Sequence, residues 1–241
     1  MAASVELRSV SVAGILHDID LRIAPGEAVA LIGRSGAGKT TTLRLINGLA
    51  TPTRGEVRVD DVALDATDLI ALRRRTGYII QSAGLFPHRN VYRNVATIPR
   101  LLGWDESRTR TEATALLDRL GLPFDKFADR LPRSLSGGEQ QRVGIARAMI
   151  AQPSILLCDE PFGALDPIVR RELQDAFVAI RGERNATIVF VTHDLPEAMR
   201  VAERIVVFDA GRVVADTPAK ELPRSDAAVV RQLVAAASLP A

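Results

Sequence analysis

The segment from Gly33 to Thr41 has the residue types and spacing of a loop that binds phosphate groups. An apolar run precedes it and a helical pattern follows it, which is the context that the G-x-x-x-x-G-K-[ST] motif requires. Glycines let backbone N–H groups close around the phosphates, the Lys39 ammonium can reach the β- and γ-phosphates, and the Thr40 hydroxyl can bind Mg²⁺. The alternative is a glycine turn that only caps a helix. The candidate phosphate-binding residues are Gly33, Arg34, Ser35, Gly36, Ala37, Gly38, Lys39, Thr40 and Thr41.

Two carboxylates, Asp159 and Glu160, follow the apolar run at 155–158. In open α/β sheets, ligands bind beyond the carboxyl ends of the strands, which is where this pair is expected. Asp159 would hold Mg²⁺ through water. Glu160 would polarise the water that attacks the γ-phosphate, because a protein contributes to phosphoryl transfer mainly by positioning the reacting groups and stabilising charge. The alternative for this pair is a solvated acidic loop.

Polar residues also follow two other predicted strands. His193 comes after the apolar run at 187–191, where it could contact the γ-phosphate and orient the attacking water. Gln81 ends the run that begins near Gly77 and could sense Mg²⁺ and water, so it is both a catalytic and a metal-site candidate. A structural histidine and a surface glutamine are the alternatives. Asp194, next to His193, is expected to cap a helix.

Small residues precede a helical pattern in the segment Leu135-Ser-Gly-Gly-Glu-Gln-Gln-Arg142. Ser136, Gly137 and Gly138 would leave a helix N-terminus whose free N–H groups and positive dipole end can hold an anion. We expect this anion to be the γ-phosphate of a nucleotide that another chain holds.

The composition favours a globular protein. Of the 241 residues, 47% are hydrophobic, which is ample for one large domain or two small ones. We expect a cytoplasmic protein that reaches a membrane only through a partner, because no stretch approaches the roughly 18 apolar residues of a membrane span and the first residues lack a signal-peptide pattern. The single cysteine, Cys158, excludes an intramolecular disulfide. Aromatic residues are only 4% and no long basic block occurs, which argues against nucleic acid as a partner.

Strands and helices must position the candidate residues. Period-two alternation and short apolar runs predict strands at 19–23, 28–32, 56–59, 77–81, 155–158 and 187–191, with a closing hairpin at 204–215. Helical spacing of apolar residues predicts helices at 40–47, 92–101, 106–120, 138–150, 167–180 and 218–237. The alternation of strands and helices indicates an α/β fold with a mostly parallel core sheet, a small antiparallel N-terminal sheet and an all-helical middle part.

Taken together, the motifs resemble one family. The phosphate loop, Gln81, LSGGEQ, ILLCDE, Gly163-Ala-Leu-Asp166 and His193 occur in the order and spacing of the ATP-binding subunits of ABC transporters. The resemblance covers nearly the whole chain and implies one ABC ATPase domain with the P-loop NTPase fold. Residues 1–85 and 153–217 would form the core and the antiparallel sheet, residues 86–152 an inserted helical subdomain with the LSGGEQ signature, and residues 218–241 a C-terminal helical tail.

This resemblance also implies a shared site and several partners. A second copy of the subunit, or a homologous ATPase subunit, meets the first head to tail and covers the ATP bound at Lys39. Gln81 begins the segment that faces integral membrane permease subunits. ATP, with Mg²⁺, closes the dimer and hydrolysis opens it, at the cytoplasmic face of the cell membrane, where the subunit is peripheral. The covering residues would be Ser136, Gly137, Gly138 and Gln140, with Asp166 across the dimer contact. The catalytic residues would be Lys39, Gln81, Glu160 and His193.

A finer resemblance concerns the cargo. Segments 77–88 and 95–104 resemble those of importers for glycine betaine, choline and related quaternary amines, which receive their cargo from a solute-binding protein. Phe86, Pro87 and Trp104 are equally compatible with packing, and Asn90 and Arg93 stand where relatives usually have threonine and an acidic residue. Amino acids, polyamines and lipids are the alternative cargoes. A soluble ATPase acting on DNA or ribosomes is disfavoured, because the chain has one cassette and no sustained heptads.

One feature of the family is missing. Relatives usually have an aromatic residue near the end of the first strand that stacks on adenine, whereas Val10-Ser-Val-Ala-Gly14 occupies that place and no aromatic residue precedes Tyr78. Stacking on a base contributes about 1 to 3 kcal/mol. We therefore predict weak adenine affinity and poor discrimination between ATP and GTP.

Overall fold

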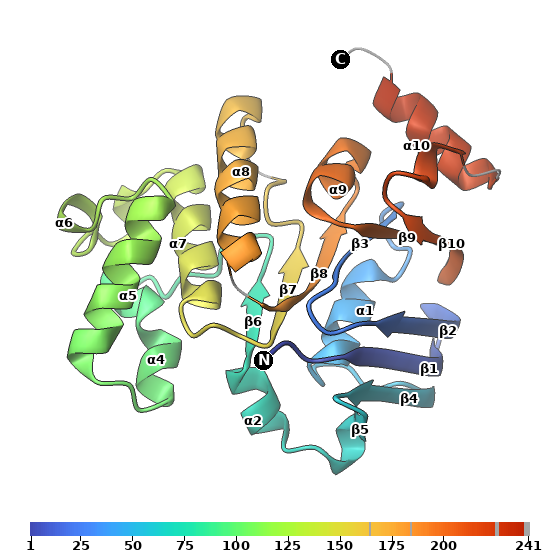
Figure 1. Ribbon diagram of the computed structural model, residues 1–241, viewed down its shortest axis with the longest axis horizontal. Coiled ribbons are helices and arrows are strands. Elements are labelled where there is room, and N and C mark those ends of the chain that lie inside the picture. Colours follow the sequence, from blue (N-terminus) through green and yellow to red (C-terminus); the bar gives the residue numbers. More distant parts are fainter. Residues whose placement is uncertain (164, 184, 225–226, 239–241) are drawn as a thin grey trace.

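Apolar residues on one face form a small antiparallel sheet at the start of the chain. The computed structural model describes residues 1–163, 165–183, 185–224 and 227–238. The strands of this sheet are β1 (Val5–Val12), β2 (Leu16–Ile23), β4 (Arg54–Val59) and β5 (Val62–Ala63), in the order β2-β1-β4-β5. Along β2, the apolar side chains are buried and the polar ones are exposed, as expected for a sheet with one solvated face. The sheet lies at the lower right of Figure 1.

A second, larger sheet forms the centre of the molecule. Its strand order is β10 (Arg212–Pro218), β9 (Arg204–Asp209), β3 (Ala28–Gly33), β8 (Thr187–Thr192), β7 (Ile155–Asp159) and β6 (Thr76–Ile79). β10 pairs antiparallel with β9, and the other neighbours pair in parallel. All residues of β3 and β8 are buried. Val29 and Leu31 face the cluster shared with the antiparallel sheet, whereas Ala30 and Ile32 face the helices.

Helices cover the central sheet and build a lobe at one end (Figure 1). The lobe contains α3 (Val91–Val95), α4 (Thr97–Leu101), α5 (Glu106–Arg119), α6 (Phe124–Phe127) and α7 (Gly137–Met149). The other helices are α1 (Lys39–Ile46), α2 (Leu69–Arg74), α8 (Pro167–Glu183), α9 (Leu195–Val201) and α10 (Ala228–Ser238), and short 3-10 turns occur at Leu64–Ala66, Pro132–Ser134 and Leu222–Arg224. Within the described ranges, no helix has the length and apolarity needed to cross a membrane.

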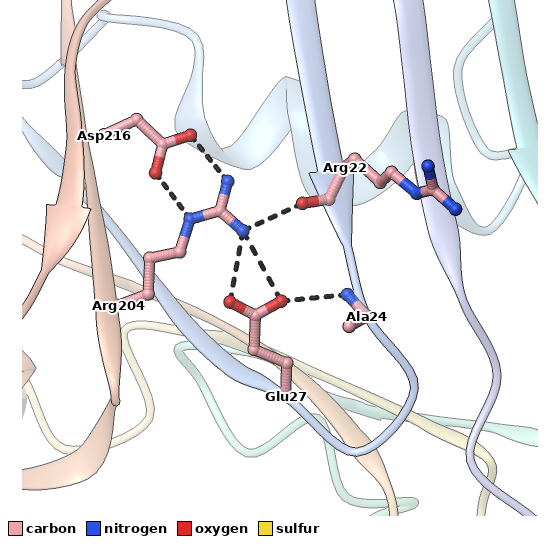
Figure 2. A network of polar contacts seen from close by, with 5 residues as sticks. All are labelled: Arg22, Ala24, Glu27, Arg204 and Asp216. Atoms are coloured by element: carbon pink, nitrogen blue, oxygen red, sulfur yellow. Dashed lines mark hydrogen bonds and ion pairs between the residues drawn. The ribbon is translucent and has the colours of Figure 1, made fainter.

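Arg204, at the start of β9, ties the two sheets together (Figure 2). Its guanidinium forms a two-point contact with Asp216 on β10, at 2.5 and 2.6 Å. Its remaining amino group donates to the carbonyl oxygen of Arg22 at 2.9 Å and to the carboxylate of Glu27 at 3.1 Å. The hydrogen bond to Asp216 is the largest of the effects that raise the pKa of Arg204, so the guanidinium stays charged. We call this set of contacts the Arg204 clamp.

The predicted α/β fold class is confirmed, with its antiparallel N-terminal sheet, parallel core and helical middle part. The closing hairpin is confirmed as β9 and β10. The predicted ranges do not include β1, whose alternation is interrupted by register shifts, the two-residue strand β5, or the short helices α2 and α6; for α9, only its cap, Asp194, was predicted.

Three predicted boundaries were wrong. The strand expected at 77–81 ends at Ile79, so Gln81 lies in the turn beyond β6. The single helix expected at 92–101 is two helices, α3 and α4, because Pro99 has no N–H to donate to the preceding turn. In the tail expected to be helical over 218–237, Pro218 still pairs in β10 and α10 begins only at Ala228; positions 225 and 226 lie outside the described residues, as do 239–241 of the predicted C-terminal tail.

Candidate nucleotide site

The glycine-rich loop lies between the end of β3 and the start of α1, as its sequence context indicates. Gly33 has a φ of +150°, and a Cβ atom there would lie 2.2 Å from the carbonyl oxygen of Phe208. Gly38 has a φ of +99°, and its Cβ atom would lie 2.3 Å from Leu16 Cδ2. Any other residue at these two positions would displace the β9 backbone or the start of β2. The loop can therefore follow this path only with glycine at both positions.

Lys39 is folded back into the loop. Its side chain is buried, and its Nζ donates to the carbonyl oxygens of Gly33 at 2.8 Å and Arg34 at 2.9 Å. Burial lowers the pKa of Lys39, and the charges of Glu160 and Asp159 oppose this shift. The ammonium thus sits among neutral acceptors, which a charged phosphate oxygen would outcompete.

Thr40, at the start of α1, contacts Asp159, the last residue of β7. The Thr40 hydroxyl donates to Oδ1 of Asp159 at 2.9 Å. Burial raises the pKa of Asp159, while the hydrogen bond from Thr40 lowers it. A hydroxyl and a carboxylate held side by side are oxygen donors of the kind that Mg²⁺ prefers.

Glu160 receives contacts from two other strand ends. Its Oε2 accepts a hydrogen bond from Gln81 Nε2 at 3.2 Å, and its Oε1 lies 3.3 Å from His193 Nδ1. Glu160 itself has a φ of +46°, a backbone conformation that residues other than glycine rarely adopt. The Glu160 side chain is 23% exposed, whereas that of His193 is 65% exposed. The three side chains therefore converge from the turns after β6, β7 and β8.

One cavity of about 510 Å³ is lined by half of the predicted site residues. It is lined by Ile15, Ser35, Gly36, Gly38, Lys39, Thr40, Thr41, Gln81, Asp159 and Glu160. His193 reaches this site through Glu160, and the side chain of Arg34 points instead to Gln232 on α10, at 3.2 Å. Gly33 and Ala37 belong to the loop without lining the cavity.

Ile15 is the lining residue that sequence reasoning missed. It lies in the turn between β1 and β2 and is 42% exposed. Its carbonyl oxygen lies close to Gly38, so the turn packs against the phosphate loop. No sequence signal locates it, because the contact depends on how the antiparallel sheet folds over the core.

The LSGGEQ segment lies outside this cavity. Ser136 caps α7: its Oγ accepts from Glu139 N at 3.2 Å, and its own N–H donates to the Glu139 carboxylate at 2.6 Å. Gln140 donates to the carbonyl oxygens of Pro132 and Leu135, both at 3.2 Å. Ser136 and Gly137 are exposed and Gly138 is partly exposed. The Ser136 hydroxyl proton is still available to donate to an external anion.

Asp166 also faces away from the cavity. Its Oδ1 accepts from the backbone N–H groups of Ile168 at 3.1 Å and Val169 at 3.0 Å, so it caps α8. Its side chain is exposed, and Ala164 of the same motif lies outside the described residues. The structure thus brings together one group of predicted residues and leaves Ser136, Gly137, Gly138, Gln140 and Asp166 on other surfaces.

Sequence comparison finds a family and close relatives. The profile of the family described as ABC transporter matches residues 16–163. The glycine betaine/carnitine/choline transport ATP-binding protein OpuCA of Bacillus subtilis is 45% identical over 212 residues, which is 88% of this chain and 56% of that protein. The glycine betaine uptake system ATP-binding protein YehX of Escherichia coli is 47% identical over 199 residues, 83% of this chain and 64% of that protein. The chain therefore spans little more than half the length of such relatives.

Structural comparison agrees with this result. The ATP-binding cassette MJ0796, in a dimeric post-hydrolysis state bound to ADP and Pi, aligns with a TM-score of 0.80 and 33% identity. The alignment covers 89% of this chain and 98% of that one. The profile match, the relatives and the shared fold lead to one conclusion: the chain belongs to the ABC transporter family.

Proposed function

We propose that this chain binds ATP and hydrolyses it at the γ-phosphate to drive transport by membrane partners. The observation that carries the proposal is the cavity in which Lys39 and the Thr40–Asp159 pair meet Glu160. A phosphate loop alone supports nucleotide binding. The two carboxylates in the same cavity add the groups needed to hold a metal ion and to orient water.

The residues present fit ATP and Mg²⁺. On binding, the Lys39 ammonium would exchange the carbonyls of Gly33 and Arg34 for β- and γ-phosphate oxygens. The oxygens of Thr40 and Asp159 would hold Mg²⁺, with the amide oxygen of Gln81 near them. When bound, Mg²⁺ supplies charge neutralisation on the phosphates.

Glu160 would polarise the attacking water, and Gln81 and His193 would orient the Glu160 carboxylate. Gln81 and His193 contact different oxygens of the Glu160 carboxylate, which fixes the direction of its lone pairs. With Nδ1 turned toward Glu160, His193 presents Nε2 for the γ-phosphate. Each of the three residues thus has a separate role in placing water in line with the bond that breaks.

The other half of the site would come from a second copy of this chain or a homologous subunit. Support comes from the position of the LSGGEQ segment: its helix N-terminus is exposed and lies outside the chain's own cavity. The cassette MJ0796 is described as dimeric with ADP and Pi bound. In the proposed head-to-tail dimer, Ser136, Gly137, Gly138 and Gln140 cover the ATP at the partner's phosphate loop, and Asp166 lies at the contact.

We further propose that the membrane partners are permease subunits of an importer for quaternary amines, fed by a solute-binding protein, with this subunit peripheral at the cytoplasmic face of the membrane. The names of the relatives support this cargo class: OpuCA is a glycine betaine/carnitine/choline transport protein and YehX a glycine betaine uptake protein. In the proposed domain division, residues 1–85 and 153–217 carry the phosphate loop and carboxylates, residues 86–152 carry the signature, and residues 218–241 form a tail.

The Glu160→Gln variant tests hydrolysis directly. We expect steady-state ATP hydrolysis to fall by about 10² to 10⁴-fold, because the amide cannot accept a proton from water. ATP binding should persist, since the loop is untouched. Glu221→Gln, an exposed carboxylate far along the chain from this site, is the matched control. Unchanged hydrolysis by Glu160→Gln would show that another group activates the water.

Mixed dimers test the shared site. Chains with Lys39→Ala lose their own phosphate contact, and chains with Ser136→Arg lose the covering residue. A pair made from one of each keeps one intact site, so we expect mixing to restore binding of a fluorescent ATP analogue that each variant alone binds weakly. If mixing restores no binding, the two halves do not come from different chains.

A further inference from the structure

Two side-chain contacts join the beginning of α8 to the beginning of α9. Gln174 Nε2 on α8 donates to Glu197 Oε1 on α9 at 3.0 Å, and both residues are buried, at 7% and 6% exposed. One turn earlier on α8, Arg170 Nη1 lies 3.7 Å from Asp194 Oδ2, the cap of α9. Arg170 and Gln174 are four residues apart, so they present the same helix face to α9.

These contacts surround the residues on either side of His193. Thr192, the last residue of β8, accepts a hydrogen bond from Asp194 N at 3.0 Å through its hydroxyl. Asp194 Oδ1 accepts from Glu197 N at 2.9 Å. His193 therefore lies between Thr192 and Asp194, which are hydrogen-bonded to each other, and α8 contacts Asp194 through Arg170 and Glu197 through Gln174. Its own side chain remains 65% exposed and contacts Glu160.

The same stretch of α8 is bound to the segment that ends at Asp166. Asp166 caps α8 through the N–H groups of Ile168 and Val169. Arg170 Nη2 donates to the carbonyl oxygen of Leu165 at 3.0 Å, so one guanidinium contacts both Leu165 and Asp194. Arg170 therefore connects the segment before Asp166 to the cap of α9.

A purely stabilising role is a poor explanation for this pair of contacts. Burying a carboxylate such as Glu197 is costly, and replacing a buried polar pair by apolar residues of similar volume is often neutral or stabilising. What a polar pair adds is a fixed register between the two helices, because only one alignment of α8 and α9 brings Gln174 to Glu197.

We propose that Arg170, Gln174 and Glu197 are positioning residues that hold His193 in place relative to the Asp166 segment. The inference rests on the proposed function, in which Asp166 lies at the contact with the second copy. Docking of that copy on the Asp166 segment sets the position of α8, and α8 sets the position of His193 beside Glu160. Hydrolysis then becomes efficient only in the assembled dimer, although none of these three residues touches the nucleotide.

The test compares Arg170→Gln and Gln174→Met with wild type in the full chain. Both changes remove a contact to α9: Gln174→Met keeps a side chain of similar length, and Arg170→Gln shortens the side chain and removes its charge. We expect kcat for ATP hydrolysis to fall about tenfold, since a misplacement of about 1 Å can cost 10²-fold in rate. KM, ATP binding and ATP-dependent dimerisation should stay within twofold of wild type, because the phosphate loop and the LSGGEQ segment are unchanged. Arg171→Gln is the matched control: it removes the same charge from the neighbouring position, which makes no polar contact with a described residue.

Histidine NMR gives a readout that a general loss of stability would not produce. The chain has three histidines, so the imidazole signals can be assigned by substitution. In Arg170→Gln, the signal of His193 should shift or broaden while those of His17 and His88 stay in place. Arg170→Lys, which keeps a cation on this helix face, should recover part of the lost rate.

A double-mutant cycle covers the case in which Gln174→Met fails to fold. Asp194→Asn keeps an oxygen that caps α9 but removes the charge facing Arg170. Arg170→Gln and Asp194→Asn combined should lose no more rate than either alone. Full activity of Arg170→Gln, additive losses, or an unmoved His193 signal would overturn the inference. If wild type itself does not hydrolyse ATP, the proposed function has failed instead.

Discussion

The Arg204 clamp makes a quantitative prediction for stability. Replacing Arg204 with methionine keeps most of the side-chain length but removes all donors to Asp216, Glu27 and the Arg22 carbonyl (Figure 2). The carboxylates of Glu27 and Asp216 would then have no cation between them. The side chains of Arg204, Glu27 and Asp216 are 25%, 19% and 32% exposed, so solvent can screen the loss only in part.

The size of the effect follows from that partial burial. Removing one partner of a fully buried ion pair costs about 3 to 5 kcal/mol, whereas an exposed pair contributes about 0 to 1 kcal/mol. Arg204 lies between these limits, and Glu27 keeps its hydrogen bond from Ala24 N at 2.8 Å. We therefore expect Arg204→Met to lower the free energy of unfolding by about 2 to 3 kcal/mol, because the clamp is charge-assisted but partly solvated. At about 2 to 4 °C per kcal/mol for a chain of this size, Tm should fall by about 4 to 12 °C.

Thermal unfolding followed by circular dichroism measures this change. Arg204→Lys keeps the charge but loses the planar two-point contact with Asp216, and should fall between wild type and Arg204→Met. Arg75→Met is the matched control, because Arg75 pairs with Asp60 at 2.8 Å while both side chains are more than 40% exposed. A Tm for Arg204→Met no lower than that of Arg75→Met would refute the reasoning from partial burial.

Three further predictions concern titration, base selectivity and the metal site. Burial raises the pKa of Tyr78, and burial with a bond to Glu106 raises that of Tyr92 to about 12, so absorbance at 295 nm should not rise near pH 10. The stability from Tyr92 is complete below its unfolded pKa of 10.0 and is lost as pH rises toward 12, which chemical denaturation between pH 9 and 11 would detect. Among the described residues that line the cavity, Ile15 is the only large apolar one, so kcat/KM for ATP and GTP should agree within about threefold, and Ile15→Tyr should raise kcat/KM for both nucleotides by about 5-fold or more, because an aromatic ring stacks on either base. Thr40→Val should raise the Mg²⁺ concentration for half-maximal hydrolysis by about tenfold, and an unchanged midpoint would remove Thr40 from the metal site.

Sequence alone predicted the lining residues of the cavity other than Ile15, because they lie at or just beyond strand ends. Parallel strands deliver their carboxyl ends to one edge of the sheet, so Lys39, Asp159, Glu160 and His193 had to lie near each other once the strands were recognised. The buried runs of β3, β7 and β8 are apolar enough to be seen without a structure. The contacts among these side chains could not be predicted from the sequence. An apolar run indicates where a strand ends, but it does not determine the side-chain rotamers.

Short elements and contacts between distant segments escaped prediction for physical reasons. Only the cap of α9, Asp194, was predicted, because the helix has seven residues and begins with Leu195-Pro196, which leaves too few turns for a periodic pattern. The placement of Ile15 beside Gly38 depends on the packing of the antiparallel sheet, and the pairing of Arg170 with Asp194 depends on the relative position of two helices. Both contacts join segments that are distant in the sequence, so no local pattern of residues indicates them.

The residues proposed to act on a second copy are already ordered in the single chain. Ser136 is fixed by its reciprocal bonds with Glu139, and Asp166 by the two N–H groups it caps. Ser136 and Asp166 thus already make their helix-capping contacts, so association does not need to form these contacts. What a lone chain lacks is the charge to attract the exposed N-terminus of α7, which a γ-phosphate would provide. Nucleotide binding, rather than refolding of the signature, should therefore control whether two copies associate.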